Sequence, residues 1–329
     1  MLGKLYINEH DYQAAKLNFE EIIASNLYQL TTHIGDNFDL EHEFNSESIF
    51  EVSFSIEAKP GTSGGAQDGP LGSEATSRAI TLASTDGGGY RSIMPSYYMT
   101  MLFMNDTMDM TNPVNADRTG NAEYSIRASY SIAISNDDNT TLYQKESGKG
   151  ATYGNNEASY LKKFQNWTWE KESELSISGI NERVIRYADI LLLHAECLIQ
   201  TNGSLPEALA AVNQIRNRAG VVLLDAADYD PDTLMEHIMW TERPLELMFE
   251  GHDIRWEDLT RWGKIKEQYT RLANIEYVFV NKVLELYDPL VHASSTPFKE
   301  FEDARDNYNP VLDDYFPIPS TELTSNPFF

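Results

Sequence analysis

The segment from Arg186 to Gly220 limits the possible folds of this chain more than any other, because it predicts two antiparallel helices. Between Tyr187 and Leu198, apolar residues recur at three- and four-residue steps, which places them on one helical face. The polar residues 201–204 end that helix, Pro206 suits the first turn of the next, and Gly220 suits a left-handed cap after it. We therefore expect a packed helical hairpin.

A second copy of this pattern is predicted at the start of the chain. The tetratricopeptide repeat, a pair of helices, requires Leu-Gly-x2-Tyr and then Ala-x3-Phe further on. The residues that match it in register are Leu2, Gly3, Tyr6, Ala15 and Phe19. In that register the Trp that opens the pattern falls before residue 1, so we expect the chain to be a fragment with its first helix cut short.

The composition predicts a sizeable core under a strongly negative surface. Hydrophobic residues make up 41% of the 329 positions, and the formal net charge is −26. Nucleic acids and anionic membranes are recognised through basic patches, so neither is an expected partner. The sequence shows no run of eighteen apolar residues and no signal peptide. Its single cysteine, Cys197, excludes an intrachain disulfide and is interpreted as a small buried residue.

Residues 31–180 differ from the helical segments, since they are rich in Gly, Ser, Thr, Asn and Asp. Residues 49–56 alternate as a half-buried strand does, and the glycine-rich runs 61–65 and 86–89 predict loops. We predict a mainly α fold in one domain spanning residues 1–329. Its parts are a tetratricopeptide-like scaffold at about 1–30 and 181–266, a loop-rich insertion with short strands at about 31–180, and a tail at 267–329.

A third helical block is expected from about Asp232 to Lys266. Pro244 should interrupt or kink its first helix, and Gly251 should end the apolar stretch that follows. The prolines at 317 and 319 make the tail extended, and we expect it to lie back across the helices.

Five motifs, in this order, resemble the RagB/SusD family. They are Arg186–Asp189 with Ala195 and Glu196; Ile215–Gly220; Glu242 and Arg243 with Glu246, Leu247 and Phe249–Gly251; Asp258 and Leu259 with Arg261–Gly263; and Pro317–Pro319 with Asn326 and Pro327. The chain departs from the family pattern at Pro244, where a second Arg is common, and by two extra residues between Gly251 and Arg255.

The resemblance implies a surface lipoprotein of Bacteroidetes-type bacteria that captures a glycan or another nutrient. It also implies an outward-facing position at the outer membrane, a lipid anchor absent from this chain, and a SusC-like TonB-dependent transporter as the partner. We therefore expect binding of an oligosaccharide or polysaccharide and its delivery to that transporter. Two alternatives stay open from the residues alone: a tetratricopeptide adaptor that binds a protein, and a surface glycosidase.

A glycan binder needs flat aromatic faces for sugar C–H groups and polar groups for the hydroxyls. The insertion offers such groups in or beside loops, and the candidate ligand-binding residues are Tyr90, Arg91, Tyr97, Tyr98, Trp167 and Trp169. The three glycines at 87–89 favour Tyr90 and Arg91, because glycine lets a ligand approach the backbone. Burial of Trp167 and Trp169 against the helices is an equally open interpretation, and Trp256 and Trp262 are expected in the core.

Motifs for catalysis are absent from the sequence. No pair among the seven histidines has zinc-protease spacing, the glycines at 87–89 lack a phosphate-loop Lys, and no Gly-x-Ser-x-Gly occurs. Residues 136–139 offer oxygen ligands for calcium but lack the glycine and glutamate of a helix-loop-helix site, so we interpret them as a turn. Helical acids such as Glu242 and Glu246 are expected in structural ion pairs. We expect no enzyme activity, no metal and no cofactor.

Overall fold

The chain folds into two compact units, of which one comprises Met1–Ile254 with Phe279–Leu284 and the other Arg255–Val278 with Glu285–Phe329. This computed structural model describes residues 1–57, 74–116, 124–137, 141–143, 145–146, 152–154, 156–167, 177–251, 253–314 and 325. The single domain expected from the sequence stays a prediction. In the described part of the chain, no helix has the length and apolar character needed to cross a bilayer.

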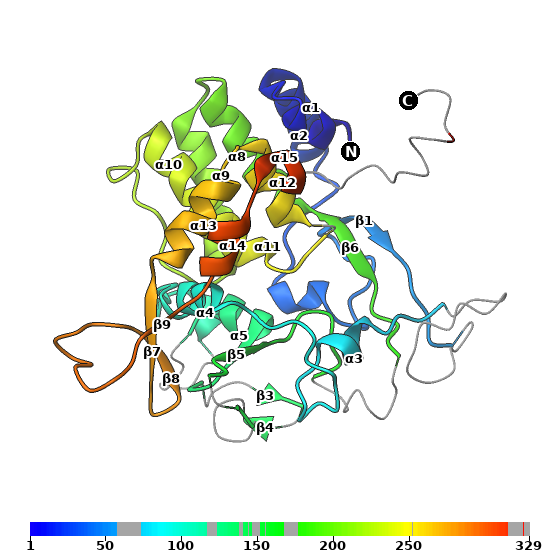
Figure 1. Cartoon of the computed structure of the whole chain (residues 1–329). Helices are drawn as coiled ribbons and strands as arrows, with labels where there is room; N and C mark the ends of the chain where they lie inside the picture. The colour runs from blue at the N-terminus through cyan, green and yellow to red at the C-terminus, as the bar shows by residue number, and fades with distance from the viewer. Residues whose placement is uncertain are drawn as a thin grey trace. The chain divides into compact units, whose positions relative to one another are not determined.

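The first unit contains the predicted tetratricopeptide-like helices (Figure 1). They are α1 (Leu2–Asn8), α2 (Tyr12–Ser25), α8 (Tyr187–Gln200), α9 (Leu205–Arg218), α10 (Pro231–His237) and α11 (Arg243–Leu247). Helix α8 packs against α9 on one side and α2 on the other. The mainly α fold class is therefore confirmed.

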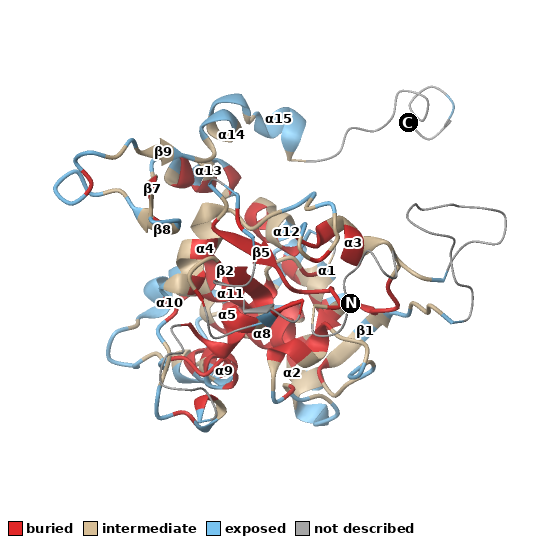
Figure 2. Ribbon diagram, turned by 90° about the horizontal axis from the view of Figure 1, so that it is seen from below, coloured by how far each residue is buried: buried red, intermediate tan, exposed pale blue. Residues whose placement is uncertain are grey.

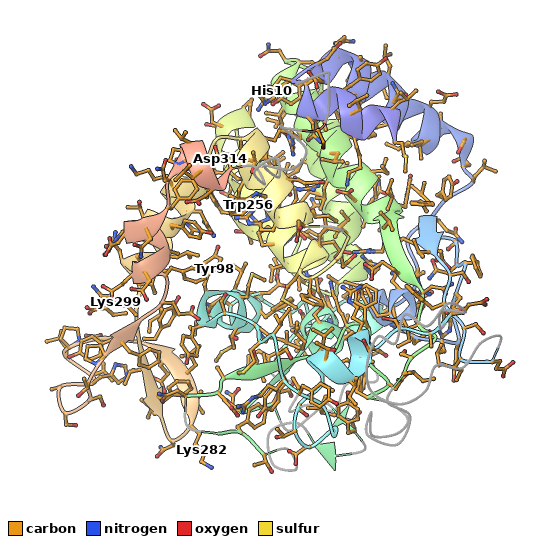
Figure 3. The ribbon with its side chains drawn as sticks, turned by 45° about the vertical axis from the view of Figure 1, so that its right-hand side comes forward. His10, Tyr98, Trp256, Lys282, Lys299 and Asp314 are labelled. Atoms are coloured by element: carbon orange, nitrogen blue, oxygen red, sulfur yellow. The ribbon has the colours of Figure 1, made fainter. Side chains whose placement is uncertain are left out.

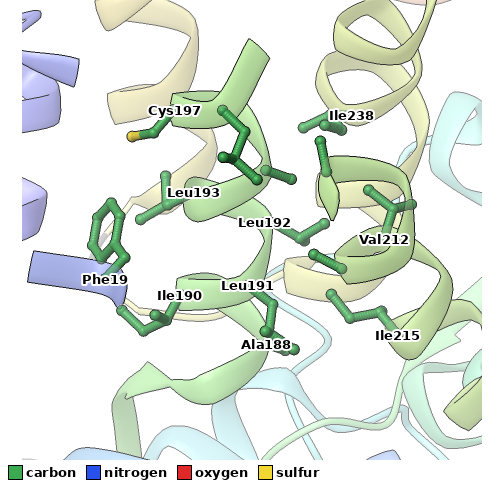
Figure 4. Packing of buried hydrophobic residues seen from close by; sticks show 14 of the residues in the cluster. Phe19, Ala188, Ile190, Leu191, Leu192, Leu193, Cys197, Val212, Ile215 and Ile238 are labelled. Atoms are coloured by element: carbon green, nitrogen blue, oxygen red, sulfur yellow. The ribbon is translucent and has the colours of Figure 1, made fainter. Parts of the chain in front are cut away.

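Local sequence signals define the α8–α9 hairpin as expected. The Ser204 side chain caps α9 by accepting from the Glu207 N–H at 3.3 Å, and Gly220 follows the helix with φ +69°. Leu192 and Val212 meet between α8 and α9, while Phe19 of α2 faces the other side of α8 (Figure 4). The hairpin is thus the centre of the main hydrophobic core.

Helices α1 and α2 meet closely because one contact residue has no side chain. A Cβ on Gly3 would lie 2.5 Å from Cε1 of Phe19, whose ring is fully buried. Ala15, one turn before Phe19, is also fully buried. The repeat residues expected to pack in this hairpin therefore do so.

The insertion consists of short elements between long connections. In its described residues these are the 3₁₀ turns Ile34–Asn37 and Pro113–Asn115, helices α3 (Arg78–Leu82), α4 (Tyr97–Met104) and α5 (Ile126–Ser131), and strands β1 (Ser48–Val52), β2 (Ile132–Ile134), β3 (Thr141–Leu142), β4 (Lys145–Glu146) and β5 (Ser159–Leu161). Strand β6 (Glu182–Arg186) follows at the start of the scaffold segment. Antiparallel pairs join β1 to β6, β2 to β5 and β3 to β4. The insertion with short strands is confirmed, although the strand predicted at 49–56 ends at Val52. Beyond it, the Phe54 N–H bonds the Asn181 side chain at 2.8 Å.

Buried ion pairs connect this insertion to the scaffold. Glu47 of the insertion pairs with Arg186 and lies 2.9 Å from Arg218. Within the scaffold, Arg186 also lies 2.5 Å from Glu250 and 3.0 Å from Glu246. These groups belong to the buried interior of the first unit, which is concentrated around α5, α8, α9 and α11 (Figure 2). The sequence predicted structural ion pairs for acidic residues of the helices, such as Glu246. It did not predict that a residue of the insertion would take part in them.

A turn of π-helix precedes Pro244. It spans Ile238–Glu242 between α10 and α11, and Pro244 occupies the first turn of α11. Proline has no N–H to donate to the preceding turn, so the wider helical turn absorbs the interruption. The α-helical geometry is thus interrupted before Pro244, as expected, and the kink stays a prediction. Gly251 adopts φ +61° after α11, as a residue that ends a helical block should.

The second unit combines helices with a three-stranded sheet of order β8-β7-β9. Its elements are α12 (Ile254–Arg261), α13 (Ile265–Ala273), β7 (Glu276–Val280), β8 (Val283–Leu286), β9 (Phe298–Lys299), α14 (Glu302–Asn307) and α15 (Pro310–Asp313). The first residue of α12 and the turn between β7 and β8 belong to the first unit. Tyr269 contacts the rings of Phe301 and Tyr308. Trp256 and Trp262, expected in the core, are only half-buried. The tail at 315–319 lies outside the described residues.

Candidate functional site

The loop between α3 and α4 contains the three glycines, and the structure gives them a packing role. A Cβ on Gly87 would lie 2.5 Å from Cζ of Tyr143, and one on Gly89 would lie 2.5 Å from the carbonyl oxygen of Ala83. Gly88 adopts φ +76°, which favours glycine. The glycines therefore let the loop pack against its own protein, which is a different reason from the ligand access expected from the sequence.

This loop is tied to residues 152–157 by three polar contacts. The Asp86 carboxylate accepts the Thr152 N–H, and the Arg91 guanidinium pairs with the Glu157 carboxylate. The Tyr97 hydroxyl donates to the main-chain carbonyl of residue 156 at 2.7 Å. Arg91 adopts φ +51°, an uncommon conformation for a residue with a side chain, and uncommon conformations of this kind concentrate at functional sites.

A buried pair of tyrosines supports these contacts from below. The rings of Tyr153 and Tyr160 stack with centroids 4.7 Å apart, and the Tyr160 hydroxyl lies 2.6 Å from Glu157. Burial raises the pKa of Tyr160, while Arg91 acts to lower it and Asp86 to raise it further. The two charged residues of the loop therefore both act on the Tyr160 hydroxyl.

An aromatic pair lies beside the polar contacts. The rings of Tyr97 and Phe279 meet edge to face at 5.8 Å and 79°, and both side chains are half-buried. Phe279 belongs to the β7–β8 hairpin, whose turn has two residues with positive φ, Asn281 and Lys282. The Ser135 hydroxyl donates to the Lys282 carbonyl at 3.0 Å and holds this turn in place. We call the surface formed by Tyr90, Arg91, Tyr97, Glu157 and Phe279 the aromatic corner.

Of the six residues expected from the sequence, Arg91 and Tyr97 contact residues 157 and 156, and Tyr90 directly precedes Arg91. Tyr90, Arg91 and Tyr97 occupy one loop and the start of α4, and Tyr90 is 63% exposed. The Tyr98 hydroxyl instead donates to the carbonyl of Trp240 at 2.9 Å, on the scaffold side of α4 (Figure 3). Tyr98 is thus tied to the π-helix.

Trp167 packs against the buried cluster that contains Tyr153 and Tyr160, and protein groups contact its ring. The Lys162 ammonium lies 3.6 Å from its centroid, and Tyr130 contacts it at 6.0 Å and 61°. Trp169, the sixth residue expected in the site, lies outside the described residues.

Comparison with known proteins identifies the family. The sequence model of the SusD family matches residues 46–328. The chain belongs to the SusD family. The resemblance drawn from the five motifs is therefore confirmed, and the tetratricopeptide-like helices are those of a SusD-family scaffold.

Relatives in this family cover the chain to different extents. SusD-like protein P25 of Formosa agariphila is 22% identical over 291 residues, which are 84% of this chain and 50% of P25. SusD-like protein P38 of the same organism is 41% identical over 99 residues, which are 28% of this chain and 19% of P38. The chain therefore spans half or less of the length of these curated relatives.

Solved structures share the fold of this chain. A SusD superfamily protein from Bacteroides vulgatus is 25% identical, with a TM-score of 0.73 over 99% of this chain and 59% of that one. Surface glycan-binding protein A from Bacteroides thetaiotaomicron, in complex with laminarihexaose, is 23% identical, with a TM-score of 0.51 over 80% of this chain and 54% of that one.

The sequence did not predict which residues contact Arg91 and Tyr97. Glu157 is one of 51 acidic residues and follows no motif, and Phe279 lies in a segment that carries no loop signal. Both reach Arg91 and Tyr97 through long-range packing of the chain. The continuous run of aromatic and β-branched residues at 277–280 could have indicated a strand but not which residues contact it.

A possible metal site lies elsewhere in the first unit. Asp36, Asp39 and His42 form the one group in the described part of the chain whose ligand atoms lie within 4.8 Å of one another. The His42 ring nitrogen is 2.9 Å from an Asp39 oxygen, and Asp39 also accepts the N–H groups of residues 41 and 42. Asp39 raises the pKa of His42 through this hydrogen bond. Local turn contacts account for the group, and the expected absence of metal stays a prediction.

Proposed function

We propose that this SusD-family protein binds an oligosaccharide at the aromatic corner. The observation that carries the proposal is the half-buried Tyr97–Phe279 pair beside the Arg91–Glu157 ion pair. Aromatic faces pack on the C–H groups of sugars, and guanidinium and carboxylate groups bond their hydroxyls. The laminarihexaose complex of a protein with the same fold supports a glycan as the ligand.

The role of the whole protein follows from the family. We propose that the longer protein presents this site on the outer surface of the outer membrane and passes its ligand to a SusC-like TonB-dependent transporter. Family membership over residues 46–328 supports this role. The six residues expected from the sequence remain candidate ligand contacts, but the proposal needs only Tyr90, Arg91 and Tyr97.

The protein would bind its ligand without cleaving it. Glycosidases place two carboxyl groups on either side of the scissile bond, one of them as a proton donor. At the aromatic corner, Glu157 accepts from Arg91, Tyr160 and the Gly154 N–H, and Asp86 accepts from Thr152. Both carboxylates are engaged by protein donors, which supports a structural role for them.

Affinity electrophoresis in gels containing soluble polysaccharides tests the proposal. We expect at least one β-glucan, α-glucan, mannan or xylan to retard the protein, and Tyr97→Ala to reduce the retardation about tenfold. Tyr97→Phe keeps the ring and loses the bond to the residue 156 carbonyl, so it should retain most of the affinity. No retardation by any glycan, or release of new reducing ends from a bound one, would contradict the proposed function.

A further inference from the structure

The Arg91 guanidinium at the aromatic corner is neutralised by the protein itself. Its Nη1 pairs with Glu157, and in the described residues this is its one charged partner. The Arg91 side chain is 37% exposed, whereas that of Glu157 is only 11% exposed. The cation therefore faces solvent with its countercharge already in place beneath it.

Glu157 is fixed in this position. One of its oxygens accepts from the Gly154 N–H and from the Tyr160 hydroxyl, while the other pairs with Arg91. If Glu157 moved away to release Arg91, the Tyr160 hydroxyl and the Gly154 N–H would each lose a bond. An anionic ligand would thus have to approach a carboxylate that cannot turn aside.

Further carboxylates surround the same tyrosines. Burial raises the pKa of Tyr160 most, and Asp86 acts to raise it further. Burial also raises the pKa of Tyr153, together with Tyr160, Asp137 and Asp86. Lys282 adds a positive charge at the hairpin tip, but its side chain is exposed, where solvent and salt screen it. Three carboxylates, from Asp86, Asp137 and Glu157, thus accompany the cations Arg91 and Lys282.

A guanidinium offers five N–H donors, and among the described residues Arg91 meets its charged partner Glu157 through Nη1. The remaining donors suit the hydroxyl oxygens of a sugar, because such bonds need no countercharge. We propose that the aromatic corner selects uncharged sugars, and that Glu157 makes it reject glycans that carry carboxylate or sulfate groups. This inference rests on the proposed function and makes Glu157 a specificity-determining residue.

Matched ligands separate the effect of charge from that of size. The probes are a neutral hexosan that the protein retains, the same polymer oxidised at C6 to the uronate, and the methyl ester of that uronate. A carboxylate placed near Glu157 should weaken binding at least tenfold at low salt. The methyl ester should restore the affinity to within about threefold, and added salt should raise the affinity for the uronate.

Glu157→Gln supplies the test at the residue itself. It removes one negative charge and keeps the shape, so it should raise the ratio of uronate affinity to neutral-polymer affinity about tenfold. Glu21→Gln, on the exposed face of α2, changes the net charge equally and should leave the preference unaltered.

The outcomes distinguish the inference from the function on which it rests. Equal or tighter binding of the uronate by the unaltered protein overturns the selection of uncharged sugars while leaving glycan binding intact. A preference that Glu157→Gln does not change also overturns it. If Glu157→Gln unfolds, the salt dependence and the methyl ester decide alone. Failure to bind any probe, charged or neutral, overturns the proposed function itself.

Discussion

Arg127 donates to Glu242 across 2.6 Å, and neither side chain is exposed to solvent. Arg127 lies in α5 of the insertion, whereas Glu242 ends the π-helix of the scaffold. Arg127 also bonds Asp106 at 2.9 Å, and Arg216 of α9 reaches Glu242 at 2.8 Å. These four charges join the loop-rich insertion, which carries the aromatic corner, to the helices behind it.

Replacing Arg127 should destabilise the protein strongly. Arg127→Met leaves the Asp106 and Glu242 carboxylates buried without this cation, which costs about 3–5 kcal/mol of unfolding free energy. Urea unfolding followed by circular dichroism measures the loss. Lys16→Met is the control, because Lys16 pairs with Glu20 at 3.9 Å near the surface and should cost less than about 1 kcal/mol. Equal losses in the two variants would contradict the role of the buried network.

Glu47 should make stability depend on pH in the acidic range. Burial acts to raise its pKa, but Arg218 and Arg186 outweigh burial and lower the pKa from 4.5 to about 2. A lowered folded-state pKa stabilises the protein above pH 4.5, and this stabilisation is lost as the pH falls towards 2. The shift corresponds to about 3 kcal/mol at neutral pH.

The comparison of Glu47→Gln with the unaltered protein measures that contribution. Unfolding free energies at pH 7, 5, 4 and 3 should show the variant less stable at pH 7 and 5. The difference should then shrink between pH 4.5 and 2, as Glu47 becomes protonated in the unaltered protein. A difference that stays constant over this range would show that the charge on Glu47 does not stabilise the fold.

The elements that the sequence predicted are those that local rules determine. Helix α8 and its apolar face follow from periodicity, and Ser204 and Gly220 bound α9 through chemistry that acts within four residues. Glu242 was expected to form an ion pair, but its partner was not predicted. Arg127 is 115 residues away in the sequence, and no local pattern points to it. Long-range partners of this type depend on the complete fold.

The same distinction between local signals and long-range contacts applies to the residues of the aromatic corner. Tyr90, Arg91 and Tyr97 could be proposed because loop aromatics beside glycines are visible in the sequence. Glu157 and Phe279 could not, since each approaches the loop from a segment at least 60 residues away in the chain. The glycines also allow a close approach to Tyr143 and Ala83 that the sequence did not predict, while ligand access at this loop stays a prediction.

Gly89 should therefore tolerate a side chain poorly. In Gly89→Ala the new Cβ would lie 2.5 Å from the Ala83 carbonyl oxygen and 2.7 Å from that of Ile80, and main-chain atoms cannot move away cheaply. We expect a loss of about 1–3 kcal/mol in unfolding free energy and weaker glycan binding, because the displaced loop carries Arg91. Thermal unfolding and affinity electrophoresis measure the two effects.

Gly179→Ala is the matched control for that change. Its added Cβ would meet its nearest neighbours at 3.4 Å, an ordinary contact distance, and its backbone needs no positive φ. We expect it to change stability by less than about 0.5 kcal/mol. If both alanine variants behave alike, the close approach at Gly89 does not determine the loop conformation.

Substitutions of Trp167 test whether this aromatic residue of the insertion binds the ligand or packs inside the protein. The Lys162 ammonium lies over its ring at 3.6 Å, and Lys162 is 1% exposed, so Trp167→Ala should open a cavity beside a buried cation. We expect a loss of about 2–4 kcal/mol in unfolding free energy. At a temperature where the variant is folded, its glycan affinity should stay within threefold of the unaltered protein, while Trp167→Phe should recover part of the stability. A tenfold loss of affinity with unchanged stability would instead place Trp167 in contact with the ligand.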